Sequence, residues 1–134
     1  MKMKLLAMAI IEKDEAILMR KKPYGSKPYE ETWYLFGVEL HEGQDPKENL
    51  IDYLKKEIGI DVSIENMTDQ TSEIKEDHDG EIKDFHYVNF VCKYISGTPI
   101  IPTGAEKVEW VPKDKLNEYD LVPPSKKLLD TLYK

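Results

Sequence analysis

The stretch from residue 45 to residue 60 carries the side chains best spaced to do chemistry. Asp52, Tyr53, Lys56 and Glu57 fall on one side of it if it is helical, because residues three and four apart share a helix face. Carboxylates on such a face can bind hard divalent cations such as Mg²⁺. Asp52 and Lys56 can instead pair with each other, since they are four residues apart with the acid first.

The helix that must position these side chains has clear start and end signals. Asp45 is an N-cap residue type, Pro46 suits the first helical position, and Glu48 completes an acidic variant of the capping box. One apolar stripe follows, made of Leu50, Ile51, Leu54 and Ile58. Gly59 is the residue type that ends a helix in a left-handed turn. The pattern predicts a helix over about 46–58 with one apolar and one polar face.

Short apolar or β-branched runs predict the strands around this helix. The runs cover residues 5–11, 16–20, 33–40, 62–64, 71–76, 85–95 and 108–111, and a second helix is predicted over 125–133. The 33–40 run is broken by Gly37. Strands, a helix, more strands and a final helix are typical of the α+β class, in which helices cover the two faces of a sheet.

The composition limits what this chain can be. Its 134 residues are 40% hydrophobic and 34% charged, which predicts a single globular domain spanning 1–134. The net charge of -7 disfavours non-specific binding to nucleic acid. No run reaches the roughly 18 to 20 apolar residues of a membrane span, and the single cysteine, Cys92, excludes an intrachain disulfide. We therefore expect a cytoplasmic protein with neither nucleic-acid nor membrane partners.

Residues 33–60, WYLFGVELHEGQDPKENLIDYLKKEIGI, resemble the Nudix box of the Nudix hydrolases (MutT-like proteins). That box is a loop–helix–loop written G-x5-E-x7-R-E-U-x-E-E-x-G-U, where U is aliphatic, and W-x-x-P-G-G usually precedes it. Residues 16–22 resemble the family's second strand, and 106–116 (EKVEWVPKDKL) resemble its late tryptophan strand. The resemblance covers nearly the whole chain and implies a Nudix-type α/β/α sandwich around a mixed β-sheet.

The box at 37–60 is degenerate where the family binds metal. The positions that shape the loop and helix are kept, namely Gly37, Leu54, Gly59 and Ile60. Five positions are replaced, by Val38 for a glycine, Gln44 for the first glutamate, Asp52 for the arginine, and Tyr53 and Lys56 for two more glutamates. Only Glu57 keeps its motif carboxylate. The scaffold of the box is therefore expected to survive better than its chemistry.

The resemblance implies hydrolysis of nucleoside diphosphates linked to another group, with Mg²⁺ or Mn²⁺ neutralising the diphosphate. On this basis the metal candidates are Glu57, Gln44 and Asp52, and the catalytic candidates are Glu57 and Glu106. A carboxylate about 4 Å from a unit charge contributes roughly 4 kcal/mol at an effective dielectric of 20, so losing two should weaken metal binding by orders of magnitude. Hydrolysis is thus expected to be weakened or lost.

Two interpretations stay open from the sequence. In one, Asp52 and Lys56 form a structural pair, no cofactor is held, and the chain is a nucleotide-sensing or protein-interaction module. In the other, a relocated metal site preserves hydrolysis. Its candidate ligands are Glu39, Glu42, Glu48, Asp52, Glu57 and Glu106.

A basic segment next to several aromatic residues is the best candidate for ligand contacts. The basic residues are Arg20, Lys21, Lys22 and Lys27, and the aromatic ones are Tyr24, Tyr29, Trp33 and Tyr34. A solvated loop is the alternative. The Nudix resemblance implies ligand contacts at this strand edge, so we take Arg20, Lys22, Tyr24, Tyr29 and Gly37 as substrate-binding candidates. Tyr24 or Tyr29 would stack on a base. The expected partner is a small nucleotide-type ligand, and the resemblance also makes a homodimer an option.

Overall fold

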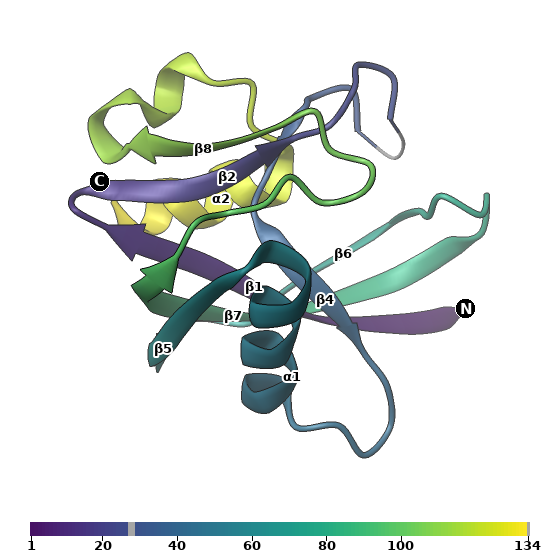
Figure 1. Cartoon of the computed structure of the whole chain (residues 1–134). Coiled ribbons are helices and arrows are strands. Elements are labelled where there is room, and N and C mark those ends of the chain that lie inside the picture. The colour runs from purple at the N-terminus through teal and green to yellow at the C-terminus, as the bar shows by residue number, and fades with distance from the viewer. Residues whose placement is uncertain (27–28, 134) are drawn as a thin grey trace.

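The computed structural model describes residues 1–26 and 29–133, and it shows a mixed β-sheet with one helix on each face (Figure 1). Lys27 of the predicted basic segment lies outside the described residues. The strands are β1 (Lys2–Lys13), β2 (Ala16–Lys21), β3 (Trp33–Tyr34), β4 (Phe36–Leu40), β5 (Ile60–Met67), β6 (Thr71–Glu76), β7 (Ile82–Gly97) and β8 (Lys107–Pro112). The helices are α1 (Pro46–Tyr53), η1 (Leu54–Ile58), η2 (Lys113–Glu118) and α2 (Pro123–Leu132). The predicted α/β/α sandwich is confirmed.

The sheet is built around β1 and β7, which pair in parallel, while the other pairings are antiparallel. The strand order is β3-β2-β1-β7-β5, with β4 on β1, β6 on β7 and β8 on β2. β2 pairs with β1 only near the hairpin turn, whereas β4 pairs with the earlier part of β1. β2 therefore separates from β1 beyond the hairpin turn and leaves a gap between them. The side chain of Arg20, at the end of β2, lies near this gap, and its Nε donates to the Leu35 carbonyl at 3.2 Å.

Helix α1 begins where the sequence predicts. The Asp45 carboxylate accepts a hydrogen bond from the Glu48 backbone N–H at 3.0 Å, and Pro46 is the first helical residue. Gly59 ends the helical segment with a φ of 81°, in the left-handed region that favours glycine. The last turn differs from the prediction, because η1 is a π-helix instead of a continuation of the α-helix.

The two helices close two hydrophobic clusters on opposite faces of the sheet. Leu50, Leu54 and Ile58 pack with residues of β1, β5 and β7 under α1. Leu128 and Leu129 of α2 pack with residues of β1, β2 and β8 on the other face. Burial of such side chains is the main term that holds the layers together. No helix in the described part of the chain is long and apolar enough to cross a membrane.

The predicted strand over 33–40 is two strands, and the break lies at Leu35, before Gly37. The backbone of Leu35 is occupied by distant side chains: its carbonyl accepts from Arg20, and its N–H donates to the Ser125 hydroxyl at 3.4 Å. These tertiary contacts explain why the break lies at Leu35, two residues before the glycine at which the sequence pattern places it.

Candidate ligand pocket and box helix

The polar face of α1 and η1 carries charges that are exposed and paired with one another. Asp52 and Lys56 lie 3.8 Å apart, with 67% and 74% of their side chains exposed. Gln44 is used by its own loop, since its Oε1 accepts from the His41 backbone N–H at 2.8 Å and from Asn49 Nδ2 at 3.1 Å. Neither Asp52 nor Gln44 is therefore placed by its contacts as a metal ligand.

Glu57 lies near the phenol of Tyr53, at a position where the Nudix motif has a glutamate. Burial raises the pKa of Tyr53, the Arg20 guanidinium opposes that rise, and the Glu57 carboxylate adds to it. These three groups thus act on one another across the gap beside β2. A fixed cation and a phenol beside the single box carboxylate make a poor environment for Mg²⁺, which prefers several carboxylate oxygens.

Glu106, the second catalytic candidate, pairs with a lysine of β2. Its Oε2 accepts from Lys21 Nζ at 2.9 Å. Lys21 alternates with Arg20 along the strand, so the two side chains leave β2 in opposite directions. Among the residues that the structure describes, no group of three or more His, Cys, Asp or Glu side chains could hold a metal ion. The residues present therefore do not fit a resident Mg²⁺ or Mn²⁺.

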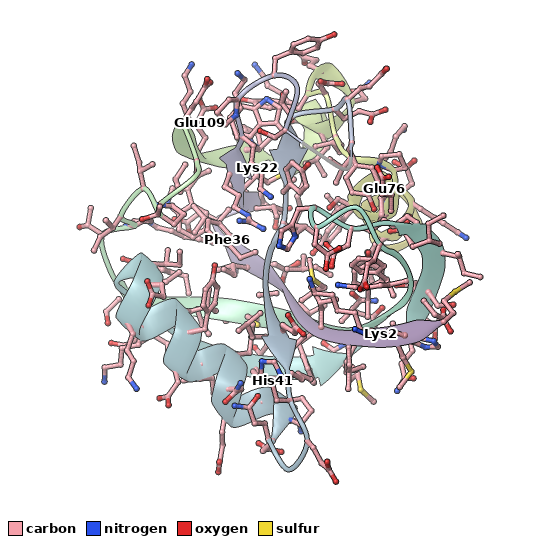
Figure 2. The ribbon with its side chains drawn as sticks, turned by 90° about the vertical axis from the view of Figure 1, so that its right-hand side faces the viewer. Lys2, Lys22, Phe36, His41, Glu76 and Glu109 are labelled. Carbon is pink, nitrogen blue, oxygen red and sulfur yellow. The ribbon has the colours of Figure 1, made fainter. Side chains whose placement is uncertain are left out.

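A cavity of about 240 Å³ lies beside Arg20, which forms part of its wall. Its walls come from β1, β2, β3, β6 and β7 and from the start of α2. The basic residues in the wall are Lys4, Arg20, Lys22 and Lys75, and the aromatic ones are Tyr29, Tyr34, Phe85 and Tyr87. In Figure 2, Lys22 lies above Phe36, and α1 lies below Phe36. His41 lies beside the start of α1. The cavity thus combines positive charge with flat apolar surfaces.

Arg20 and Lys22 are mostly buried cations without a neutralising acid. Lys22 Nζ lies 4.4 Å from the centre of the Tyr34 ring, and Arg20 Cζ lies 5.6 Å from the same ring. Within the described parts of the chain, neither forms an ion pair with a carboxylate. Burial lowers the pKa of Lys22 to about 8, and the charges of Arg20 and Lys75 contribute to the lowering. The cavity wall therefore holds positive charge at a cost in free energy.

The Tyr34 hydroxyl is a second unsatisfied group in the same wall. Tyr34 is only 8% exposed, and its hydroxyl makes no hydrogen bond to any residue that the structure describes. A buried hydroxyl without a partner is unfavourable by about 1–3 kcal/mol. It can donate a hydrogen bond to an oxygen of a molecule in the cavity.

Lys75 lies among aromatic rings of the cavity wall, and the sequence analysis missed it. Its Nζ lies 4.3 Å from the ring centres of both Tyr29 and Phe85. It donates to the Tyr29 hydroxyl, to the Tyr87 hydroxyl at 2.8 Å and to Glu73 Oε2 at 3.2 Å. The alternating pattern of β6 does not distinguish Lys75 as a candidate site residue, because its ring neighbours come from other strands and a loop.

Lys4 differs from Lys22 because a buried acid neutralises it, as Glu73 does for Lys75. Lys4 and Lys83 both donate to Asp77 Oδ2 at 2.9 Å, and Asp77 is only 4% exposed. Burial alone would raise the pKa of Asp77, but the hydrogen bonds from Lys83 and Lys4 hold it well below its usual range. This ion cluster is a structural part of the wall.

The five residues predicted to bind ligand are not all brought together. Arg20, Lys22 and Tyr29 line the cavity, whereas Tyr24 is 84% exposed and lies outside its wall. Gly37 acts indirectly: a Cβ at this position would lie 2.3 Å from Sδ of Met8, a cavity residue. Glycine here leaves room for the Met8 side chain.

Comparison with solved structures identifies the fold. A NUDIX hydrolase from Nitrosomonas europaea matches with a TM-score of 0.76 at 17% identity, over 97% of this chain and 87% of its own. A MutT protein from Methanosarcina mazei Go1 matches with a TM-score of 0.77 at 16% identity, over 97% and 92%. A UDP-X diphosphatase matches with a TM-score of 0.70 at 20% identity, over 99% of this chain and 64% of its own.

The chain has the Nudix fold, as these structures show and as the sequence analysis predicted. No protein-family model matches its sequence, and no curated protein matches it significantly.

Proposed function

We propose that this chain binds a small phosphorylated ligand of the nucleotide type in the cavity beside β2, and that metal-dependent hydrolysis is weakened or lost. The observation that carries this proposal is the pair of mostly buried cations, Arg20 and Lys22, which face the cavity and have no carboxylate partner among the residues described. An anion in the cavity would relieve their mutual repulsion, because unit charges a few Å apart at low dielectric interact by several kcal/mol.

The aromatic residues in the wall are compatible with a nucleotide-type ligand. Tyr29 and Phe85 offer ring surfaces on which a flat group can pack. A UDP-X diphosphatase shares the fold, which is consistent with a ligand that carries a diphosphate.

Loss of hydrolysis follows from the box helix. Asp52 is paired with Lys56, Gln44 is bonded within its loop, and Glu106 is paired with Lys21. Glu57 is the one motif carboxylate that remains, and a lone exposed carboxylate holds a divalent cation weakly. Residual hydrolysis through Glu57 is the second candidate, since this residue stays exposed on a fold otherwise built like those of NUDIX hydrolases.

Titration calorimetry with ATP in the presence of EDTA tests the binding proposal. We expect the native chain to bind, Lys22→Gln to weaken binding at least about tenfold, and Lys107→Gln to leave it unchanged. Lys107 is an exposed lysine of β8, so its variant makes the same change of charge outside the cavity. Equal losses in both variants, or no binding by the native chain, would contradict the proposal.

A turnover assay separates binding from hydrolysis. The chain is incubated with nucleoside triphosphates, ADP-ribose, NADH and dinucleoside polyphosphates, each with Mg²⁺ and with Mn²⁺, and the products are measured. We expect no more than slow turnover. Rapid turnover that disappears in Glu57→Gln would show that the helix still works as a metal site.

A further inference from the structure

Resting on the proposed function, we propose that the cavity recognises the phosphate chain of its ligand and is nearly indifferent to the base. In this account Arg20, Lys22 and Lys75 form one cationic row along which two or more phosphates lie. These side chains neutralise the phosphates in place of a metal ion.

Aromatic rings hold the three cations in a row. Arg20 and Lys22 both lie against Tyr34, with 5.6 and 4.4 Å to its ring centre. Lys75 lies 4.3 Å from the centre of the Tyr29 ring, and the centres of the Tyr29 and Tyr34 rings are 6.0 Å apart. Because the three cations are divided between two neighbouring rings, we take them as one extended cationic surface.

Charge along the row is only partly neutralised by the protein. Lys75 is paired with Glu73 at 3.2 Å and also donates to the Tyr29 and Tyr87 hydroxyls, so it acts on the ligand through its charge, at longer range. Arg20 and Lys22 have no ion-pair partner among residues 1–26 and 29–133. The buried Tyr34 hydroxyl, which has no hydrogen-bond partner there either, points to an oxygen acceptor in the same place. Phosphate oxygens satisfy cations and a hydroxyl donor together.

The cavity has few free acceptors with which to identify a base. The Asp77 carboxylate is engaged by Lys4, Lys83 and the His78 ring. Glu73 accepts from Tyr29 at 2.5 Å and from Tyr87 at 2.7 Å. The Ser125 hydroxyl accepts from the Leu35 backbone N–H. Base recognition depends on unpaired donors and acceptors that match the base edge, and a pocket whose acceptors are already bonded gains little from it.

Competition binding in EDTA tests this inference on the native chain. A fluorescent ATP analogue is displaced by inorganic phosphate, pyrophosphate, tripolyphosphate, ATP and adenosine. We expect tripolyphosphate to compete within about threefold of ATP, each phosphate added to the series to tighten binding severalfold, and adenosine to compete at least about a hundredfold more weakly. Affinity should also fall steeply with salt.

Charge variants test the row itself. We expect Lys75→Gln to weaken tripolyphosphate binding about tenfold while weakening phosphate binding much less, because only the longer anion spans the row. Lys75→Arg should retain most of the affinity, and Lys107→Gln should change nothing. Thermal melting checks that each variant is folded. If Lys75→Gln is not folded, the ligand series on the native chain tests the inference instead.

The outcomes separate this inference from the proposed function. If ATP binds and tripolyphosphate does not displace it, the base is recognised and the inference is wrong, while the proposed function stands. If adenosine competes as well as ATP, the inference is equally wrong. If neither ATP nor tripolyphosphate binds, both proposals fail.

Discussion

The polar face of the box helix and the wall of the cavity both carry lysines, but they balance charge in opposite ways. Lys56 is exposed and paired with Asp52, so solvent and salt screen both charges and the pair contributes little. Lys22 is mostly buried beside Arg20, and no acid in the described part of the chain neutralises it. A buried, unpaired charge lowers the stability of the ligand-free protein. Such charges are expected where a ligand binds. This difference is the reason why we propose that the ligand binds in the cavity.

The largest expected effect concerns the cation cluster of the cavity wall that Asp77 neutralises. Asp77→Asn leaves Lys4 and Lys83 without their shared carboxylate and should lower the free energy of unfolding at pH 7 by about 2–3 kcal/mol. Urea denaturation measures this loss. The Asp77 pKa is lowered on folding, so its contribution is present above about pH 4 and is lost as pH falls further. The native chain and the variant should therefore converge in acid.

If Asp77→Asn were as stable as the native chain, the distinction between neutralised and unneutralised cations in this wall would collapse. Asp79→Asn is the control, since Asp79 is an exposed partner of Lys83 in the following turn and its loss should lower the free energy of unfolding much less than Asp77→Asn does.

The second effect would rebuild the missing charge of the box helix. Tyr53→Glu combined with Lys56→Glu places three carboxylates on one face with Glu57 and should raise Mn²⁺ affinity at least about tenfold. The increase should be smaller than for a complete site, because the Arg20 charge acts on position 53. Calorimetric titration with Mn²⁺ measures it.

Lys47→Glu combined with Lys55→Glu is the control for the rebuilt face, and it adds one more unit of negative charge than the rebuilt variant does. Both lysines are exposed on the same helical segment, outside the 53, 56 and 57 cluster. Equal Mn²⁺ affinity in the two double variants would mean that general negative charge, and not this face, attracts the ion.

The third effect is a pH dependence confined to the cavity. Because the pKa of Lys22 is lowered to about 8, its charge is lost in the free protein as pH rises above that value. ATP affinity should therefore fall severalfold between about pH 7 and pH 9 and level off beyond it. Arg20 and Lys75 also face Lys22, and the arginine stays charged throughout. In Lys22→Gln the step should shrink, and an unchanged step would assign it to another group.

The smallest effect concerns the exposed pair of the helix. Asp52→Asn removes the partner of Lys56 and should lower the free energy of unfolding by no more than about 0.2–0.5 kcal/mol. ATP affinity should not change. Chemical denaturation and calorimetry check the two statements, and a clear loss of ATP binding would place Asp52 in the ligand site.

The parts of this molecule that follow from local sequence were predictable, and the cavity was not. Asp45 caps α1 and Gly59 ends the helical segment because each acts on backbone within a few residues of itself. The Asp52–Lys56 pair is likewise a matter of helical spacing. Lys75, by contrast, reaches its ring partners only because β6 pairs with β7 and the loop carrying Tyr29 packs against them.

The same reasoning explains the mixed outcome for the basic segment. Its composition indicated a ligand site, and Arg20, Lys22 and Tyr29 do line the cavity. Nothing in the local sequence distinguishes Tyr29 from Tyr24, which is exposed outside the wall. The difference arises from the hydrogen bond between Tyr29 and Glu73, which are distant along the chain.

ATP titration with and without a divalent cation tests the central claim most directly, namely that side-chain cations bind the phosphates and no resident metal is needed. The account predicts that ATP binds at least as tightly in EDTA as in excess Mg²⁺, because Mg²⁺ removes part of the charge that Arg20 and Lys22 attract. Binding that is absent in EDTA and appears only with Mg²⁺ or Mn²⁺ would contradict it.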